Sequence, residues 1–135
     1  MLSLFMNKIK QHEGLKLKPY NCSAGVLTIG YGHNLENGIT KKQAELLFEV
    51  DFENCIADVD KVFGEDVDIF SEVYGVLLDL MFNLGYERFC GFKKFIAAIK
   101  CKDYHKAADE LVDSKWYRQV GTRAVWAVNT IRGVV

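Results

Sequence analysis

The sequence predicts an α+β fold in which a small sheet-containing lobe is joined by a long helix to a helical lobe. Three observations support this class. Residues 15–33 form short extended segments separated by glycine-containing turns. Residues 41–63 carry apolar side chains at helical spacing without a break. The rest of the chain repeats shorter helical patterns, each bounded by a capping residue or a glycine.

The length and composition indicate one folded domain made of two lobes. The 135 residues suffice to bury a core, and the 50% of hydrophobic residues argues against disorder. We place the N-terminal lobe at about 12–60 and the C-terminal lobe at about 61–135. The first helix, 2–12, is assigned to the C-terminal lobe.

The N-terminal residues MLSLFMNKIK predict this first helix, whose apolar residues share one face. They lack the basic start and the small-residue cleavage site of an export signal, so we expect a cytoplasmic protein. No apolar run reaches the roughly 18 residues that a membrane-spanning helix needs. The apolar residues of this face are Leu2, Phe5, Met6 and Ile9.

The long helix and the one after it have clear boundary signals. Thr40 and Gln43 form a capping box before the helix at 41–63. Ser71 caps the next helix, which is apolar nearly all round and ends at Gly85. This pattern predicts the buried centre of the helical lobe.

Three shorter helices complete the chain. Apolar residues from Phe92 to Ile99 mark the first, and Asp103 caps the second. A short helical turn is expected at Trp116, and Thr122 opens a last helix through about Arg132.

Charge is unevenly distributed along the chain. Residues 1–87 hold 7 Lys/Arg and 14 Asp/Glu, whereas residues 88–135 hold 10 and 4, within a formal net charge of −1. The basic last third could face an anionic polymer, and two ordinary solvated surfaces explain the split equally well. Nucleic acid is a weaker candidate, because no basic cluster is interleaved with aromatic residues in a known binding motif.

The four cysteines show neither CxxC spacing nor a Cys/His metal pattern. We therefore expect no metal and, in a cytoplasm, reduced thiols. The cysteines are Cys22, Cys55, Cys90 and Cys101.

Residues 9–34, IKQHEGLKLKPYNCSAGVLTIGYGHN, contain the side chains best suited to chemistry. Glu13 ends an apolar helical run, and Cys22 and Thr28 follow at intervals of eight and five residues. Glycines and one proline between them supply the bends that would bring a helix end, a turn and a strand together.

This stretch carries a family resemblance. HEGLKLKPY, a turn and GVLTIGYGH resemble the N-terminal lobe of phage-type lysozymes, the endolysins of glycoside hydrolase family 24. The family pattern is a Glu, eight residues, an Asp or in some members a Cys, five residues and a Thr, and the present chain fits the Cys variant. DLMFNLGYERFCGF (79–92) resembles the family's central buried helix and the turn after it, and SKWYRQVGTRA (114–124) resembles its closing segment.

The resemblance implies a lysozyme-like fold that binds a glycan strand in the groove between its lobes. The implied activity is that of a muramidase, which hydrolyses the β-1,4 bond between N-acetylmuramic acid and N-acetylglucosamine in peptidoglycan for phage-type host lysis. It implies a monomer without a cofactor or membrane insertion of its own, which needs a holin to reach the wall from the host cytoplasm. A lytic transglycosylase and an inactive glycan-binding module remain alternatives.

Each candidate residue has a functional and an ordinary interpretation. Glu13 suits the general acid, since carbonyls at a helix end disfavour a carboxylate, but surface glutamates at helix ends are common. Thr28 could hold a water molecule or simply favour a strand. By resemblance Asn34 and Phe82 line the groove, although Phe82 could equally be core, and Arg123 lies beside the catalytic glutamate.

Cys22 has three open roles. As a thiolate it could attack or stabilise the anomeric carbon, as a thiol it could help place water beside Thr28, and it could be a turn residue without a role. We favour the thiol, because Arg123, the residue expected to favour the thiolate, is assigned to Glu13.

Overall fold

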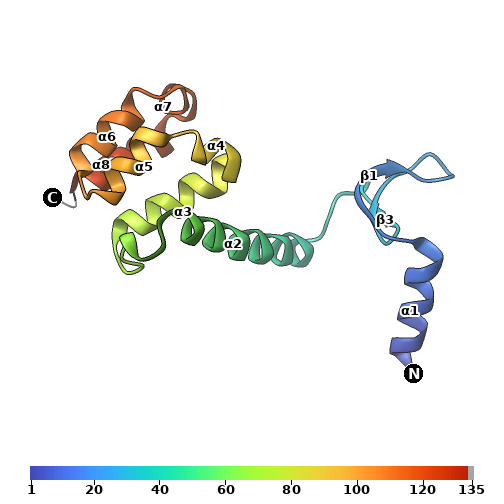
Figure 1. Ribbon diagram of the computed structural model, residues 1–135. Helices are drawn as coiled ribbons and strands as arrows, with labels where there is room; N and C mark the ends of the chain where they lie inside the picture. The colour runs from blue at the N-terminus through green and yellow to red at the C-terminus, as the bar shows by residue number, and fades with distance from the viewer. Residues whose placement is uncertain (134–135) are drawn as a thin grey trace. The chain divides into compact units, whose positions relative to one another are not determined.

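The computed structural model describes residues 1–133 and confirms the α+β class. The chain divides into two compact units, the first spanning Met1–Leu47 and the second beginning at Phe48. Figure 1 shows the elements of each unit, a small sheet in the first and short helices in the second. The boundary between the units falls within helix α2 (Lys41–Phe63).

The first unit contains one helix and a three-stranded antiparallel sheet of order β1-β2-β3. Its helix ends as predicted, because Gly14 adopts a φ of 71° and donates its N–H to the Lys10 carbonyl at 2.8 Å. The elements are α1 (Leu2–Glu13), β1 (Lys16–Asn21), β2 (Leu27–Gly30) and β3 (His33–Asn34).

The second unit is helical. After α2 come a 3-10 turn η1 (Gly64–Asp66), α3 (Glu72–Leu84), α4 (Tyr86–Cys90), α5 (Lys93–Lys100), α6 (Tyr104–Val112), α7 (Lys115–Val120) and α8 (Thr122–Gly133). Two elements were not predicted from the sequence, the short η1 and the helix α4, where a turn was expected. Helix α4 forms because Phe89 is buried and its ring packs edge-on against Phe63 and Phe95, with centroids 6.0 and 6.4 Å apart.

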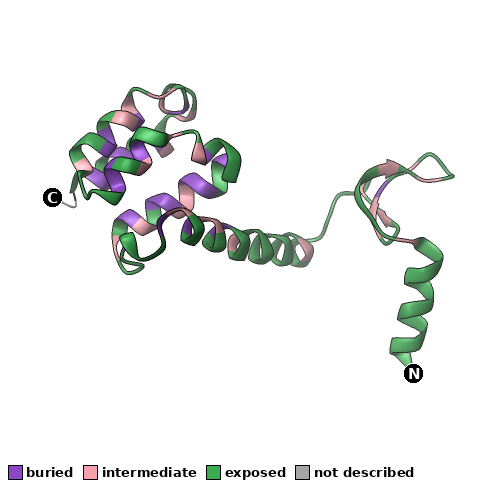
Figure 2. Ribbon diagram, in the orientation of Figure 1, coloured by how far each residue is buried: buried purple, intermediate pink, exposed green. Residues whose placement is uncertain are grey.

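Helix α3 is the buried centre of the second unit, as its apolar pattern predicted. Figure 2 shows buried residues concentrated on α3 and on the helices that follow it. Leu77, Leu80 and Met81 of α3 are almost completely buried and belong to the same core as Leu111 and Ile131. This core is therefore assembled mainly within the second unit.

The predicted helix caps are present. The Thr40 hydroxyl accepts from the Gln43 N–H at 3.1 Å, and the Gln43 side chain accepts from the Thr40 N–H at 2.8 Å. Ser71 and Asp103 accept the expected N–H groups at 3.3 and 3.2 Å. The sequence thus located these helix starts from local chemistry alone.

The first unit leaves the apolar face of α1 exposed. This face is the one formed by Leu2, Phe5, Met6 and Ile9. The assignment of helix 2–12 to the C-terminal lobe, and the lobe boundary near residue 60, stay predictions. Within residues 1–133, no helix combines the length and the hydropathy needed to cross a bilayer.

Candidate active site

Glu13 is the last residue of α1, so its side chain lies at the helix end where backbone carbonyls are left unpaired. The carboxylate packs directly on Gly32, in the turn between β2 and β3. Within the first unit, no hydrogen bond or ion pair is made by this exposed carboxylate.

The sheet brings Thr28 and Asn34 together. Thr28 pairs in register with Tyr20 on β1 and with Asn34 on β3. Residues paired directly across neighbouring strands point to the same face of a sheet. Thr28 and Asn34, two of the candidate site residues predicted from the sequence, therefore share one face of the sheet.

Thr28 is buried, with 4% of its surface exposed. Its hydroxyl donates to the Val26 carbonyl at 2.8 Å. A hydroxyl has one proton and two lone pairs, so this bond leaves the oxygen free to accept. Thr28 is therefore fixed in place, and its remaining hydrogen-bonding capacity is mainly that of an acceptor.

Cys22 begins the tight turn before β2. Its N–H donates to the Val26 carbonyl at 2.9 Å, and its carbonyl accepts the Gly25 N–H at 2.8 Å. Backbone hydrogen bonding from Val26 and Ala24 lowers the pKa of the Cys22 thiol, partial desolvation opposes it, and the neighbouring Thr28 side chain adds a smaller lowering. The structure thus brings Cys22 and Thr28 together.

The prediction of a neutral Cys22 considered charged neighbours and not these amides, and it stays a prediction. Two backbone dipoles of a tight turn have the same effect on a thiolate as a nearby cation, though weaker. The sequence feature that could have indicated this effect is the run of small residues Ser23, Ala24 and Gly25. Small residues allow a tight turn, in which several backbone N–H groups can lie near one atom.

Asn34 ends β3 and forms a turn with the residues after it. Its side-chain carbonyl accepts the Glu36 N–H at 2.8 Å. This bond orients the side chain and leaves the two amide hydrogens as donors. Asn34 can therefore offer donors to hydroxyl or acetamido oxygens of a sugar.

Phe82 and Arg123 line one cavity of about 470 Å³ in the second unit. The Phe82 side chain is half exposed, and its ring lies 5.5 Å from that of Phe48. The cavity is walled mainly by aromatic and apolar side chains, from Phe48, Phe52, Gly75, Leu78, Asp79, Phe82, Arg123 and Trp126. Phe82 is thus a half-exposed cavity residue and not a fully buried core residue.

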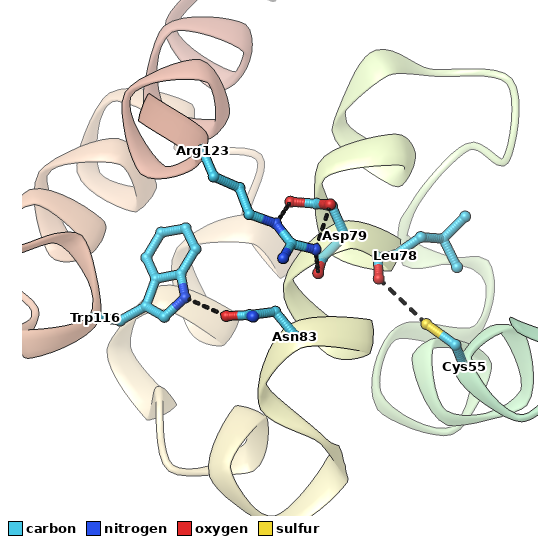
Figure 3. Close-up of polar contacts among 6 residues, drawn as sticks. All are labelled: Cys55, Leu78, Asp79, Asn83, Trp116 and Arg123. Atoms are coloured by element: carbon cyan, nitrogen blue, oxygen red, sulfur yellow. Dashed lines mark hydrogen bonds and ion pairs between the residues drawn. The ribbon is translucent and has the colours of Figure 1, made fainter. Parts of the chain in front are cut away.

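Arg123 forms a two-pronged ion pair with Asp79 (Figure 3). Its Nε donates to Asp79 Oδ2 at 2.8 Å, and its Nη2 donates to Asp79 Oδ1 at 2.7 Å. The hydrogen bonds to Asp79 raise the pKa of the Arg123 guanidinium further above its ordinary value. Sequence reasoning missed this partner, although Asp79 opens the DLMFNLGYERFCGF segment.

The Asp79 pair changes what Arg123 offers electrostatically. A guanidinium bonded at both prongs by a carboxylate is largely neutralised as a long-range charge. The position of Arg123 beside Glu13 stays a prediction. Arg123 also lines the aromatic cavity of the second unit.

No group of three or more His, Cys, Asp or Glu side chains in residues 1–133 is arranged to hold a metal ion.

The sequence is similar to known proteins over most of its length. The phage lysozyme family model matches residues 10–131. An endolysin of Acyrthosiphon pisum secondary endosymbiont phage 1 is 33% identical over 114 residues, covering 80% of this chain and 73% of the relative. An endolysin of Salmonella phage P22 is 32% identical over 117 residues, covering 77% and 75%. A probable T4-type lysozyme of Dictyostelium discoideum is 24% identical over 154 residues, covering 92% and 91%.

Proposed function

Because the chain belongs to the phage lysozyme family, we propose that it is a muramidase that hydrolyses the β-1,4 bond between N-acetylmuramic acid and N-acetylglucosamine. The chain is a glycoside hydrolase of the lysozyme type that degrades peptidoglycan. The observation that carries the proposed bond chemistry is the position of the Glu13 carboxyl at the end of α1, in the same unit as the Cys22–Thr28 pair.

Glu13 is the proton donor in this mechanism. Its carboxylic acid gives a proton to the glycosidic oxygen as the bond to the anomeric carbon breaks, and positive charge develops on that carbon and its ring oxygen.

Cys22 and Thr28 hold the attacking water. The Thr28 oxygen accepts one water hydrogen, and the neighbouring Cys22 side chain contacts the same water. Water adds to the anomeric carbon and gives up one proton, which a Cys22 thiolate or bulk solvent accepts. The turn amides that lower the thiol pKa increase the share of the first route as pH rises.

Sugar binding is assigned to Asn34, Phe82 and Arg123. Asn34 has two amide donors available, and Phe82 presents a half-exposed ring of the kind that stacks on the apolar face of a sugar. Arg123 supplies donors at the rim of the cavity that Phe82 lines. These assignments extend the family pattern residue by residue.

The proposed biological role is host lysis by a phage or prophage. The enzyme would be made in the host cytoplasm as a monomer and would act on the wall after a holin permeabilises the membrane. The endolysin name of the two phage relatives supports this role.

The products of peptidoglycan digestion test the reaction. Purified peptidoglycan is incubated with the protein, and the new glycan termini are identified by mass spectrometry. Hydrolysis gives reducing N-acetylmuramic acid ends. A 1,6-anhydro sugar would identify a lytic transglycosylase, which needs only one acid/base, and binding without any new ends would identify an inactive glycan-binding module.

Substitution of Glu13 tests its role directly. Glu13→Gln keeps the shape of the side chain but has no acidic proton, so turnover should fall by at least on the order of 10²-fold while the fold persists. Glu45→Gln, which removes another exposed carboxylate of the first unit, is the matched control and should retain wild-type turnover. Normal turnover in a folded Glu13→Gln protein would refute the assignment.

A further inference from the structure

Among the glycines of residues 1–133, Gly32 is the one at which the side chain of another residue fills the space where a β-carbon would lie. A methyl group built on Gly32 would lie 2.7 Å from Cδ and 3.2 Å from Cγ of Glu13, and closer still to Oε2. At the other ten glycines, all within residues 1–133, the same space is open or, at Gly91, approached only by backbone. The Glu13 carboxyl thus rests on the bare α-carbon of Gly32.

The contact has different consequences for stability and for chemistry. The atoms that an added methyl displaces belong to the end of a flexible, exposed side chain, so the fold can yield at little cost. The same atoms are the proton donor of the proposed reaction. A misplacement of about 1 Å in a catalytic group can lower a rate on the order of 10²-fold.

We propose that Gly32 is a positioning residue for Glu13, which sets the location of the proton-donating carboxyl by having no side chain. This proposal rests on the proposed acid role of Glu13. Gly32 has no side chain that could react with the substrate. It acts through Glu13, and the reaction therefore requires glycine here for space as well as for backbone conformation.

The backbone requirement can be separated from the space requirement. Gly32 has a φ of 74°, in the left-handed region that L residues with a side chain rarely adopt. Gly30, the last residue of β2 and two positions before Gly32, has a φ of 69° and nothing within 4 Å of an added methyl. Alanine at either position carries a similar backbone strain, and only alanine at 32 meets Glu13.

The experiment compares Gly32→Ala with the matched control Gly30→Ala. Thermal unfolding midpoints should fall by similar amounts in both. On a soluble glycan oligomer, Gly32→Ala should lose on the order of 10²-fold in kcat and shift the pH dependence of kcat, while Gly30→Ala keeps both near wild type. Equal losses of kcat in the two variants would overturn the proposal, because backbone strain would then explain both.

A second readout does not depend on turnover. The ¹³C chemical shift of the labelled Glu13 side-chain carboxyl is measured as a function of pH in the wild type and in both variants. Only Gly32→Ala should change this titration curve. If the wild type shows no turnover, the proposed function fails, yet this measurement still decides whether Gly32 positions Glu13. Identical curves in Gly32→Ala and wild type would overturn the positioning role.

Discussion

At the scale of single residues, the backbone of the turn Cys22–Gly25 changes the acidity of a side chain, the Cys22 thiol. The N–H groups of Val26 and Ala24 lower the pKa of the Cys22 thiol without any neighbouring charge. In most phage-type lysozymes that the sequence resembles, an aspartate stands at this position. Because the turn lowers the pKa of the thiol, the thiolate forms more readily here than in a free cysteine.

Substitutions at Cys22 should therefore be tolerated when the new side chain binds water. Cys22→Ser should keep substantial activity, because its hydroxyl still holds the water, but should lose any rise in rate that comes from thiolate formation as pH increases. The activity of Cys22→Asp should match or exceed that of the wild type. Rates of hydrolysis of a soluble glycan, measured as a function of pH, test the predictions for both variants. A glycosyl adduct trapped on Cys22, with Cys22→Ser as inactive as Glu13→Gln, would instead identify a nucleophile.

Alkylation distinguishes the thiols of the native protein. Iodoacetamide should modify Cys22 and block activity by bulk, and Cys22→Ser should resist this inactivation. Cys55 is the internal control, because burial and the nearby Asp58 and Asp79 raise the pKa of its thiol to about 11. Its sulfur also donates to the Leu78 carbonyl at 3.2 Å (Figure 3). Peptide mapping should find Cys55 unmodified, and modification of Cys55 before Cys22 would contradict the pKa directions.

At the scale of elements, α3 is joined to the C-terminal helices by polar contacts as well as by the core. Arg123 of α8 holds Asp79, and the Trp116 Nε1–H of α7 donates to the Asn83 side chain at 2.8 Å. Both acceptors belong to α3, one turn apart (Figure 3). These directional bonds fix how α7 and α8 pack on the central helix.

The Arg123–Asp79 pair should contribute to the stability of the second unit. Arg123→Lys replaces a two-pronged contact by a single one and should cost about 1 kcal/mol, a figure lowered for solvent screening because the Arg123 side chain is 38% exposed. Arg132→Lys is the matched control on the same helix, since Arg132 makes a single 3.1 Å contact with the exposed Asp109. Urea unfolding measures both, and equal costs would argue against a special role for the Asp79 pair.

At the scale of the whole molecule, charge is divided along the chain. The basic residues concentrate after residue 87, in α4–α8, whereas much of the acidic excess lies in α2 and the residues up to α3. Peptidoglycan with its attached polymers is an anionic surface on which such a basic region can act at long range. The described residues include exposed lysine pairs at two helix starts, Lys93 and Lys94 of α5, and Lys41 and Lys42 of α2.

Activity on whole walls should fall as salt rises past about 0.1 M, where the Debye length is about 10 Å, whereas activity on a short neutral glycan should change little. Lys93→Gln with Lys94→Gln should weaken this salt dependence. Lys41→Gln with Lys42→Gln removes the same charge from another helix start and should leave it unchanged. Equal salt effects on both substrates, or equal effects of the two pairs, would argue against wall binding by the basic C-terminal region.

The local chemistry of the chain was enough to predict its class and most of its elements. Thr40 with Gln43, Ser71 and Asp103 start helices where predicted, because capping depends on residues within one turn of each other. The apolar pattern of α3 likewise predicted its burial, because a helix that is apolar on all sides has to be covered. Glu13, Cys22 and Thr28 belong to one short stretch of chain, and their shared role in catalysis stays a prediction.

Other features depended on contacts between residues far apart or on the path of the backbone. The sequence alone did not show that Asp79 would hold Arg123, 44 positions away, or that Phe89 would anchor a helix in place of a turn. Nor did it show that turn amides would lower the Cys22 pKa, or that Gly32 would support the Glu13 carboxyl. Helical periodicity and caps are local and can be read along the chain. Ion-pair partners, turn amides and the space beside a glycine exist only once the chain has folded, and they decide how the candidate site is held.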